Sequence, residues 1–257
     1  MKTKFLITAI LIGLGVNVGI AQISDSSLNY LMVREDMVKP SRAADYEASL
    51  TDLALFLSDQ KVESVNYMTQ LQDNFHYSHV VRLNSLNDID GGLRSYVQGE
   101  KKSAEFDLIW SDLKETINGY RYYVVQYQPE LSYVPDGKIW LEEAPYRRWN
   151  YLHFEPGTEK EAEQILLAWK NLYKDKGVKS GFRVFKGVIG LDQPVYMFTT
   201  WSATPLDYQI ELQESIELLD DEGTILWIAM MELVRKAETV EGWYLPQYSF
   251  NPETKKK

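Results

Sequence analysis

The sequence predicts an α+β protein built from two tandem copies of one unit, each an antiparallel sheet with helices on one face. The main observation is an internal repeat: strand, helix, two strands, helices and strand occur over residues 28–135 and again over 146–252. Two strands that flank a helix, twice over, are typical of a split β-α-β unit with an antiparallel sheet. The composition, 45% apolar and 25% charged, is that of a folded globular protein.

The N-terminal residues 1–21 have the features of a secretory signal peptide. Lys2 and Lys4 precede an apolar stretch over 5–20, and residues 19–21 supply small side chains at the −3 and −1 positions of a cleavage site. A permanent anchor is the alternative, but a membrane span needs about 20 apolar residues and this stretch is shorter. We therefore expect a periplasmic or secreted protein that has no membrane contact after cleavage.

Each copy opens with a β-rich run that leads into a helix. The run 30–33 matches the run 151–154, which places Met32 opposite His153. Apolar residues then recur at helical spacing and predict one helix in each copy. They are Leu50, Leu53, Ala54 and Leu57 in the first copy, and Ala162, Ile165, Leu166, Trp169 and Tyr173 in the second. Thr158 with Glu161 predicts a capping box at the start of the second of these helices.

A hairpin and further helices follow in each copy. The first hairpin is expected to run over 62–70, turn at Asp73-Asn74 and return over 76–83. The second is expected to run over 178–188, turn over 190–194 and return over 195–201. Ser85 and Thr204 are predicted helix N-caps, and Pro205 suits the first helical position. The helices that follow carry Trp110 and Trp227 at matching points.

Each copy closes with an aromatic strand that ends before a proline, at 122–133 and at 243–250. The strands end in the similar triplets 131–133 and 248–250. The predicted organisation has five parts. They are a signal peptide 1–21, a first repeat 22–135, a linker 136–145, a second repeat 146–252 and a disordered tail 253–257.

This order of elements resembles the dimeric α/β barrels. These form a ferredoxin-like superfamily that includes antibiotic-biosynthesis monooxygenase-like and NIPSNAP-like proteins. The resemblance covers nearly all of the mature chain, twice, and rests on element order, the Ser/Thr-x-x-Asp stop after the third strand and the aromatic strand ends. In that family two subunits pack sheet against sheet. The resemblance implies an intrachain pseudo-dimer, α/β-barrel-like, whose two aromatic sheet faces cover each other, so that both monomer and homodimer are open.

Charge and residue usage exclude several classes of function. A net charge of −10 makes nucleic acid a poor partner, because the field of the protein repels phosphates. The chain has no cysteine, which excludes disulfides, thiolate metal sites and thiol nucleophiles. His76 and His79 are three apart on a predicted strand, so their side chains are expected on opposite faces. No metal site is predicted, and no catalytic set is recognised.

Six residues are candidates for lining a ligand pocket, because such pockets are apolar and aromatic with few polar groups. They are His153, Trp169, Arg183, Tyr196, Trp201 and Trp227. For His153 the stronger interpretation is a hydrogen-bonded core histidine, and for the tryptophans it is core packing. All six lie in the second copy, which favours that copy as the functional one.

Two hypotheses of function follow, together with a purely structural role for the second copy. The first is an exported protein without a cofactor that binds a small apolar or aromatic ligand or a protein partner. The alternative, implied by the resemblance, is a cofactor-light monooxygenase or a haem-binding or haem-degrading enzyme. In such enzymes the substrate or the haem supplies the reactivity, so a chain without a recognisable catalytic motif fits.

Overall fold

A computed structural model describes residues 30–63, 65–83, 86–89, 104–135 and 143–252. The expected signal peptide, most of the expected linker and the expected tail lie outside these residues. Among the described helices, none combines the length and the apolar character needed to cross a bilayer.

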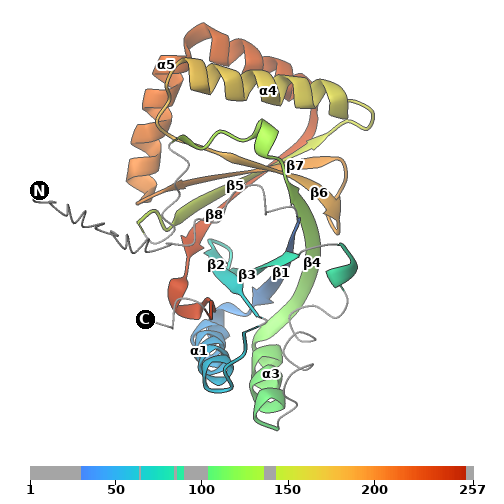
Figure 1. Ribbon diagram of the computed structural model, residues 1–257, viewed down its shortest axis with the longest axis vertical. Coiled ribbons are helices and arrows are strands. Elements are labelled where there is room, and N and C mark those ends of the chain that lie inside the picture. Colours follow the sequence, from blue (N-terminus) through green and yellow to red (C-terminus); the bar gives the residue numbers. More distant parts are fainter. Residues whose placement is uncertain (1–29, 64, 84–85, 90–103, 136–142, 253–257) are drawn as a thin grey trace, which may run out of the picture.

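Eight antiparallel strands close into one barrel, in the order β1-β3-β2-β8-β5-β7-β6-β4 (Figure 1). The first repeat contains β1 (Tyr30–Val38), α1 (Ala43–Asp59), β2 (Tyr67–Gln72), β3 (His76–Leu83), α3 (Ala104–Thr116) and β4 (Ile117–Tyr127). The second contains β5 (Tyr146–Phe154), α4 (Glu159–Asp175), β6 (Arg183–Ile189), β7 (Val195–Ser202), α5 (Pro205–Glu232) and β8 (Val234–Tyr244). The α+β class and the pseudo-dimeric barrel arrangement predicted from the sequence are confirmed.

The two four-stranded sheets face each other and also join at their edges. β2 pairs with β8 over three residue pairs, and β4 pairs with β6 over four. Face-to-face packing alone was expected. The edges pair as well because an uncovered edge strand leaves backbone N–H and C=O groups without partners, and closure removes those edges. In Figure 1, α1 and α3 cover the sheet of the first repeat, while α4 and α5 cover that of the second on the opposite side of the barrel.

Side chains alternate along each strand between the barrel interior and the helix layer. The interior is filled by apolar side chains from both repeats. They are Leu31, Val33, Val80, Tyr123, Val125, Tyr127, Trp149, Tyr151, Phe185, Val195 and Met197. Separate apolar clusters lie between each sheet and its own helices. The barrel is therefore packed through its middle, and polar side chains gather toward its ends.

The segments that close the two repeats cross over to the other repeat. Phe250 pairs with Tyr67, and Tyr133 pairs with Phe182 in the same geometry. The serine before each closing residue accepts a backbone hydrogen bond from the neighbouring strand, at 2.8 Å for Ser249 and 2.9 Å for Ser132. The predicted match between 131–133 and 248–250 is confirmed. β4 and β8 themselves end earlier than predicted, at Tyr127 and Tyr244. A short 3₁₀ turn follows each strand, and its last residue is the first residue of the triplet.

The predicted match between 30–33 and 151–154 is wrong. β1 and β5 both have nine residues, and each shows a register shift before its last residue, at Val38 and at Phe154. Aligning these two shifts makes Tyr30 the counterpart of Tyr146 and Met37 the counterpart of His153, at an offset of 116 residues. The sequence error arose because both strands contain tyrosine and apolar residues at low identity. The two alignments differ by five residues, and an odd difference matches each interior side chain of one strand with a helix-face side chain of the other.

The helix starts give one confirmation and one correction. Thr204 caps α5, since its Oγ1 accepts a hydrogen bond from the Asp207 N–H at 3.1 Å, and Pro205 is the first helical residue. The capping box predicted at Thr158 is wrong. Its hydroxyl instead donates to the Glu155 carbonyl at 2.7 Å, which stabilises the turn before α4 rather than the helix itself.

The two hairpins form as predicted at their turns and returning strands. The first turns at Asp73-Asn74, and the returning strands begin at His76 and Val195. The outgoing strands start five residues later than expected, at Tyr67 and Arg183. The stretch before β2 packs through Val62 and Val65 against the core without joining a strand.

Candidate active site

Three consecutive charged residues, Arg34-Glu35-Asp36, lie in the middle of β1 and are all buried. Their exposed fractions are 6%, 1% and 3%. Because strand side chains alternate, Glu35 points into the barrel, whereas Arg34 and Asp36 point to the helices. The sequence analysis missed this feature. The available signal was a charged triplet between the apolar runs 31–33 and 37–38, since a charge in such a strand requires a partner.

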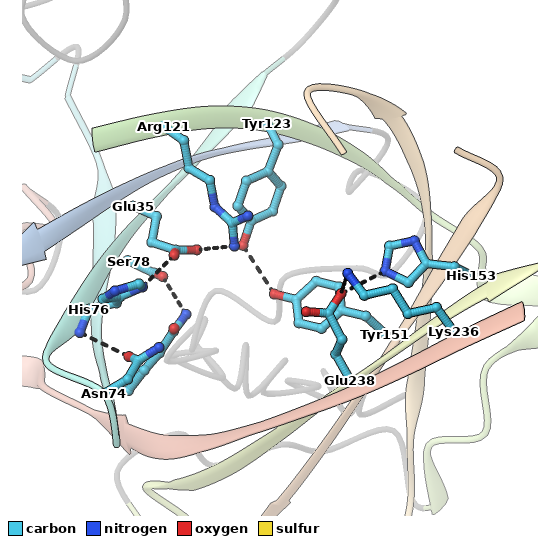
Figure 2. Close-up of polar contacts among 11 residues, drawn as sticks. Glu35, Asn74, His76, Ser78, Arg121, Tyr123, Tyr151, His153, Lys236 and Glu238 are labelled. Carbon is cyan, nitrogen blue, oxygen red and sulfur yellow. Dashed lines mark hydrogen bonds and ion pairs between the residues drawn. The ribbon is translucent and has the colours of Figure 1, made fainter. Parts of the chain in front are cut away.

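Glu35, His76 and Arg121 form what we call the mouth site, at one end of the barrel interior (Figure 2). Glu35 Oε1 lies 2.7 Å from His76 Nδ1, and Glu35 Oε2 accepts a hydrogen bond from Arg121 Nη2 at 2.9 Å. The sheet sets this geometry, because Glu35 is directly opposite Arg121 on β4 and lies two residues before Met37, which pairs with His76 on β3. Three strands thus position the site.

The mouth site is open on one side. The Glu35 side chain is 1% exposed, that of His76 26% and that of Arg121 48%. Burial alone would lower the pKa of Arg121, but the hydrogen bond and charge of Glu35 raise it, so the guanidinium stays charged. In the neutral tautomer whose Nδ1–H donates to Glu35, His76 Nε2 carries the lone pair. No residue in the described part of the chain engages Nε2, which is therefore free to accept a proton.

Across the mouth from Glu35 lies a second polar group, which Figure 2 shows on the far side of a tyrosine pair. The hydroxyls of Tyr123 and Tyr151 are 3.3 Å apart, and burial raises the pKa of Tyr151 to about 12. Beyond them, His153 Nδ1 lies 2.8 Å from the Asp192 carbonyl, and Nε2 lies 3.0 Å from Glu238 Oε1. Both contacts are hydrogen bonds when the ring is protonated. His153 is thus the hydrogen-bonded core histidine that the sequence favoured.

The other face of β1 carries a closed network beneath α1. Arg34 Nε donates to Asp36 Oδ1 at 2.7 Å, and the Tyr46 hydroxyl donates to Asp36 Oδ2 at 2.7 Å. His79 Nε2 lies 2.7 Å from the same hydroxyl, and its Nδ1 lies 3.0 Å from Thr69 Oγ1. Burial lowers the pKa of His79 to about 4, so the ring is neutral at pH 7. Both ring nitrogens are engaged and the residue is 3% exposed, which leaves His79 no atom for a substrate.

The expectation that His76 and His79 face opposite ways is confirmed. His76 bonds Glu35 on the interior face, while His79 bonds Tyr46 in the helix layer. The part of the chain that the structure describes also holds no cluster of three or more histidine, aspartate or glutamate side chains suited to a metal ion.

The structure does not gather the six candidates from the sequence into one pocket. By strand alternation His153, Arg183 and Trp201 lie on the interior face, whereas Tyr196 lies on the helix face and its hydroxyl donates to Glu163. Trp169 and Trp227 lie on α4 and α5, with ring centroids 6.4 Å apart. A cavity of about 60 Å³ between β7 and α5 touches Trp201 but none of the other five.

Core packing was expected for Trp110 and Trp227, and the structure divides them. Trp110 is 6% exposed and packs over the Arg34 guanidinium at 4.7 Å, whereas Trp227 is 50% exposed. The prediction of core packing is therefore confirmed for Trp110 and wrong for Trp227. The reason is that Trp227 lies on the solvent side of α5, where its ring contacts Trp169 on one side and is otherwise exposed.

Comparison with known proteins supports the fold. No family model matches the chain, and neither does any curated protein. Among solved structures, an anthrone oxidase-like protein superimposes with a TM-score of 0.59 at 12% identity, over 86% of this chain and 93% of that one. A putative monooxygenase from Fusobacterium nucleatum gives 0.56 at 12% identity, over 88% and 95%. A chlorite dismutase from Candidatus Nitrospira defluvii gives 0.50 at 11%, over 88% and 94%. This chain therefore has the dimeric α/β barrel fold, as the resemblance implied.

Proposed function

We propose that the protein is an oxygenase that acts at the mouth site, with His76 as the general base. The observation that carries the proposal is a histidine whose Nδ1 is held by a buried carboxylate and whose Nε2 is free at an open position. A carboxylate on one ring nitrogen fixes the tautomer and stabilises the imidazolium that forms when the other nitrogen accepts a proton. Arg121 adds a charged group beside the base.

The proposed reaction starts at an activated CH₂ group of a small keto-aromatic substrate. His76 Nε2 takes one proton, and Arg121 holds the negative charge that develops on the substrate oxygen. The carbanion transfers electrons to dioxygen, and a carbon–oxygen bond forms. The proton returns to give a hydroperoxide, which loses water as the carbonyl forms. The balance is one CH₂ group and one dioxygen to one carbonyl and one water.

The fold supports this choice of chemistry. An anthrone oxidase-like protein and putative monooxygenases share the barrel, and reactions of this kind depend on a reactive substrate rather than on a tightly built metal centre. The site then has to position the substrate, move one proton and stabilise one charge. The mouth site contains a group for each of the last two tasks.

Haem, the cofactor that the resemblance offers as an alternative, does not fit these histidines. His79 and His153 have both ring nitrogens engaged. The free nitrogen of His76 lies beside the ionic groups of Glu35 and Arg121, and a haem bound there would place its apolar macrocycle against them. The proposed reaction needs no haem.

Oxygen uptake with anthrone as the substrate tests the proposal, because its CH₂ group is flanked by two rings and a conjugated carbonyl. The His76→Gln variant is expected to lose a factor of about 100 or more in rate, the usual share of a general base. His79→Gln is the matched control, a histidine three residues away on the opposite face, and it should keep its rate within about threefold at a temperature where circular dichroism shows it folded.

Two outcomes would overturn parts of the proposal. A wild-type rate no higher than that of buffer would remove the oxygenase assignment. An equal loss of rate in the His76→Gln and His79→Gln variants would contradict the assignment of the active site to the mouth site.

We also propose that the protein is exported, on the basis of the N-terminal segment 1–21. Protein from a periplasmic fraction or culture medium is expected to begin at Gln22, as measured by intact mass. An intact chain that begins at Met1 and stays with the membrane would contradict export by cleavage.

A further inference from the structure

A groove runs along the outer surface where β2 of the first repeat meets β8 of the second. We call it the seam groove. Its volume is about 310 Å³, within the range of small-molecule sites. Its lining comes from both repeats and consists of Leu71, Gln72, Asp73, Phe75, Tyr146, Pro205, Glu241, Gly242 and Trp243. None of the three residues of the mouth site lines it, although Phe75 directly precedes His76 in the chain.

Three of the nine lining residues of the seam groove are aromatic, and two of these, Phe75 and Trp243, are exposed. Phe75 is 42% exposed and Trp243 37%, and the Trp243 ring lies 5.5 Å from that of Tyr146. Phe75 also has a backbone φ of +61°, a conformation that bulky side chains rarely adopt. The hydrogen bond from the Val38 N–H to the Phe75 carbonyl, at 3.2 Å, helps to fix this turn. An aromatic residue of the groove lining therefore adopts an unfavourable backbone conformation.

The charge of the seam groove is negative. Its lining contains two carboxylates, Asp73 and Glu241, and no lysine, arginine or histidine. Glu241 accepts a hydrogen bond from the Tyr146 hydroxyl at 2.6 Å and pairs with Arg148 at 3.3 Å. Asp73 has no ion pair within the residues that the structure describes. A ligand in the groove therefore meets aromatic faces and an uncompensated carboxylate, on a protein of net charge −10.

We propose that the seam groove binds a small planar aromatic cation. Flat aromatic bodies stack on rings such as Phe75 and Trp243, and the face of an aromatic ring attracts positive charge. Asp73 supplies the opposite charge at the rim. An aromatic anion of the same size would gain the stacking but meet the repulsion of Asp73 and of the acidic protein.

Titration calorimetry of the full mature chain with two matched probes tests the proposal. The 2-naphthylmethylammonium ion and naphthalene-2-sulfonate share a ring system and differ in charge. The cation is expected to bind roughly tenfold more tightly, and both Trp243→Ala and Asp73→Asn should weaken its binding by several-fold to tenfold. Trp227→Ala, which removes an exposed tryptophan at the far end of α5, should leave the affinity unchanged.

A fourth variant separates loss of the ligand site from loss of folding. Phe75→Gly relieves the positive φ, so its unfolding midpoint should hold or rise while its affinity for the cation falls. Equal affinity for the two probes would contradict recognition of charge. Unchanged binding by Trp243→Ala, or no binding of either probe, would overturn the site.

Discussion

The two repeats share a scaffold but differ in what they bury. Both contain a 17-residue first helix and an eight-residue third strand, and both join these by the same hydrogen bond. The Tyr77 hydroxyl donates to Glu47 at 2.7 Å, and the Tyr196 hydroxyl donates to Glu163 in the second repeat. The chain thus preserves the tie between helix and sheet in both halves.

Within the described residues, the second repeat buries one charged side chain, Arg147, which is 3% exposed, whereas the first repeat buries three, Arg34, Glu35 and Asp36. In its helix layer, Arg34, Asp36, Tyr46, Thr69 and His79 have the counterparts Asn150, Leu152, Ala162, Val184 and Phe198. At the mouth, Glu35, His76 and Arg121 have the counterparts Tyr151, Val195 and Glu238. The first repeat therefore contains a buried ionic triplet for which the second has no counterpart, and burying charge costs stability unless the charges are paired. This difference supports the mouth site proposed for the first repeat, whereas the sequence had favoured the second.

The largest effect is expected when one residue of the first repeat is replaced by its counterpart. Asp36→Leu leaves the buried Arg34 without its carboxylate and should cost about 3–5 kcal/mol of unfolding free energy. The double variant Arg34→Asn with Asp36→Leu, which copies Asn150 and Leu152, should recover most of that loss. Denaturant unfolding measures both. A cost below about 1 kcal/mol for the single variant would mean that the pair is not a buried unit.

The first repeat should also make a pH-dependent contribution to stability, through His79, that the second repeat lacks at the equivalent Phe198. The pKa of His79 is lowered to about 4 by burial, while an unfolded histidine titrates near 6.5, so the unfolded state binds more protons between these values. Stability is therefore lost as the pH falls from about 6.5 to about 4, by about 3 kcal/mol from this group. The His79→Phe variant, which copies Phe198, should lose that part of the slope. An unchanged slope would show that His79 titrates normally in the folded protein.

Tyr67 gives a smaller effect of opposite sign. Its hydroxyl is buried and has no hydrogen-bond partner within the described residues, and its counterpart in the second repeat is Phe182. Tyr67→Phe removes an unsatisfied polar group and should raise the unfolding free energy by about 1–2 kcal/mol. Thermal or denaturant unfolding would reveal the gain. A loss instead would indicate a partner, such as a bound water, at that hydroxyl.

The smallest effects are expected at the shared tie between helix and sheet. Tyr77→Phe and Tyr196→Phe each remove one hydrogen bond to a glutamate and should cost about 1 kcal/mol. Because the two ties are equivalent, the two costs should agree within about 0.5 kcal/mol. A large inequality would show that the repeats do not share this part of the scaffold.

The sequence predicted what is local and could not predict what depends on pairing. The turn at Asp73-Asn74 and the cap at Thr204 follow from residue types with known backbone preferences. The mouth site was missed because His76 and Arg121 lie 41 and 86 residues from Glu35 and meet it only through the register of three strands. The five-residue error in matching β1 with β5 hid this further, since it inverted which side chains face the interior.

Chemical modification of the histidines tests the central claim most directly and needs no knowledge of the substrate. Diethyl pyrocarbonate acylates a neutral, accessible ring nitrogen, and peptide mass spectrometry locates the adduct. Brief treatment of the folded protein should label His76 at its free Nε2 and leave His79 and His153 unlabelled, because both nitrogens of each are engaged. An unlabelled His76, or equal labelling of His79, would contradict an open, carboxylate-held base at the mouth of the barrel.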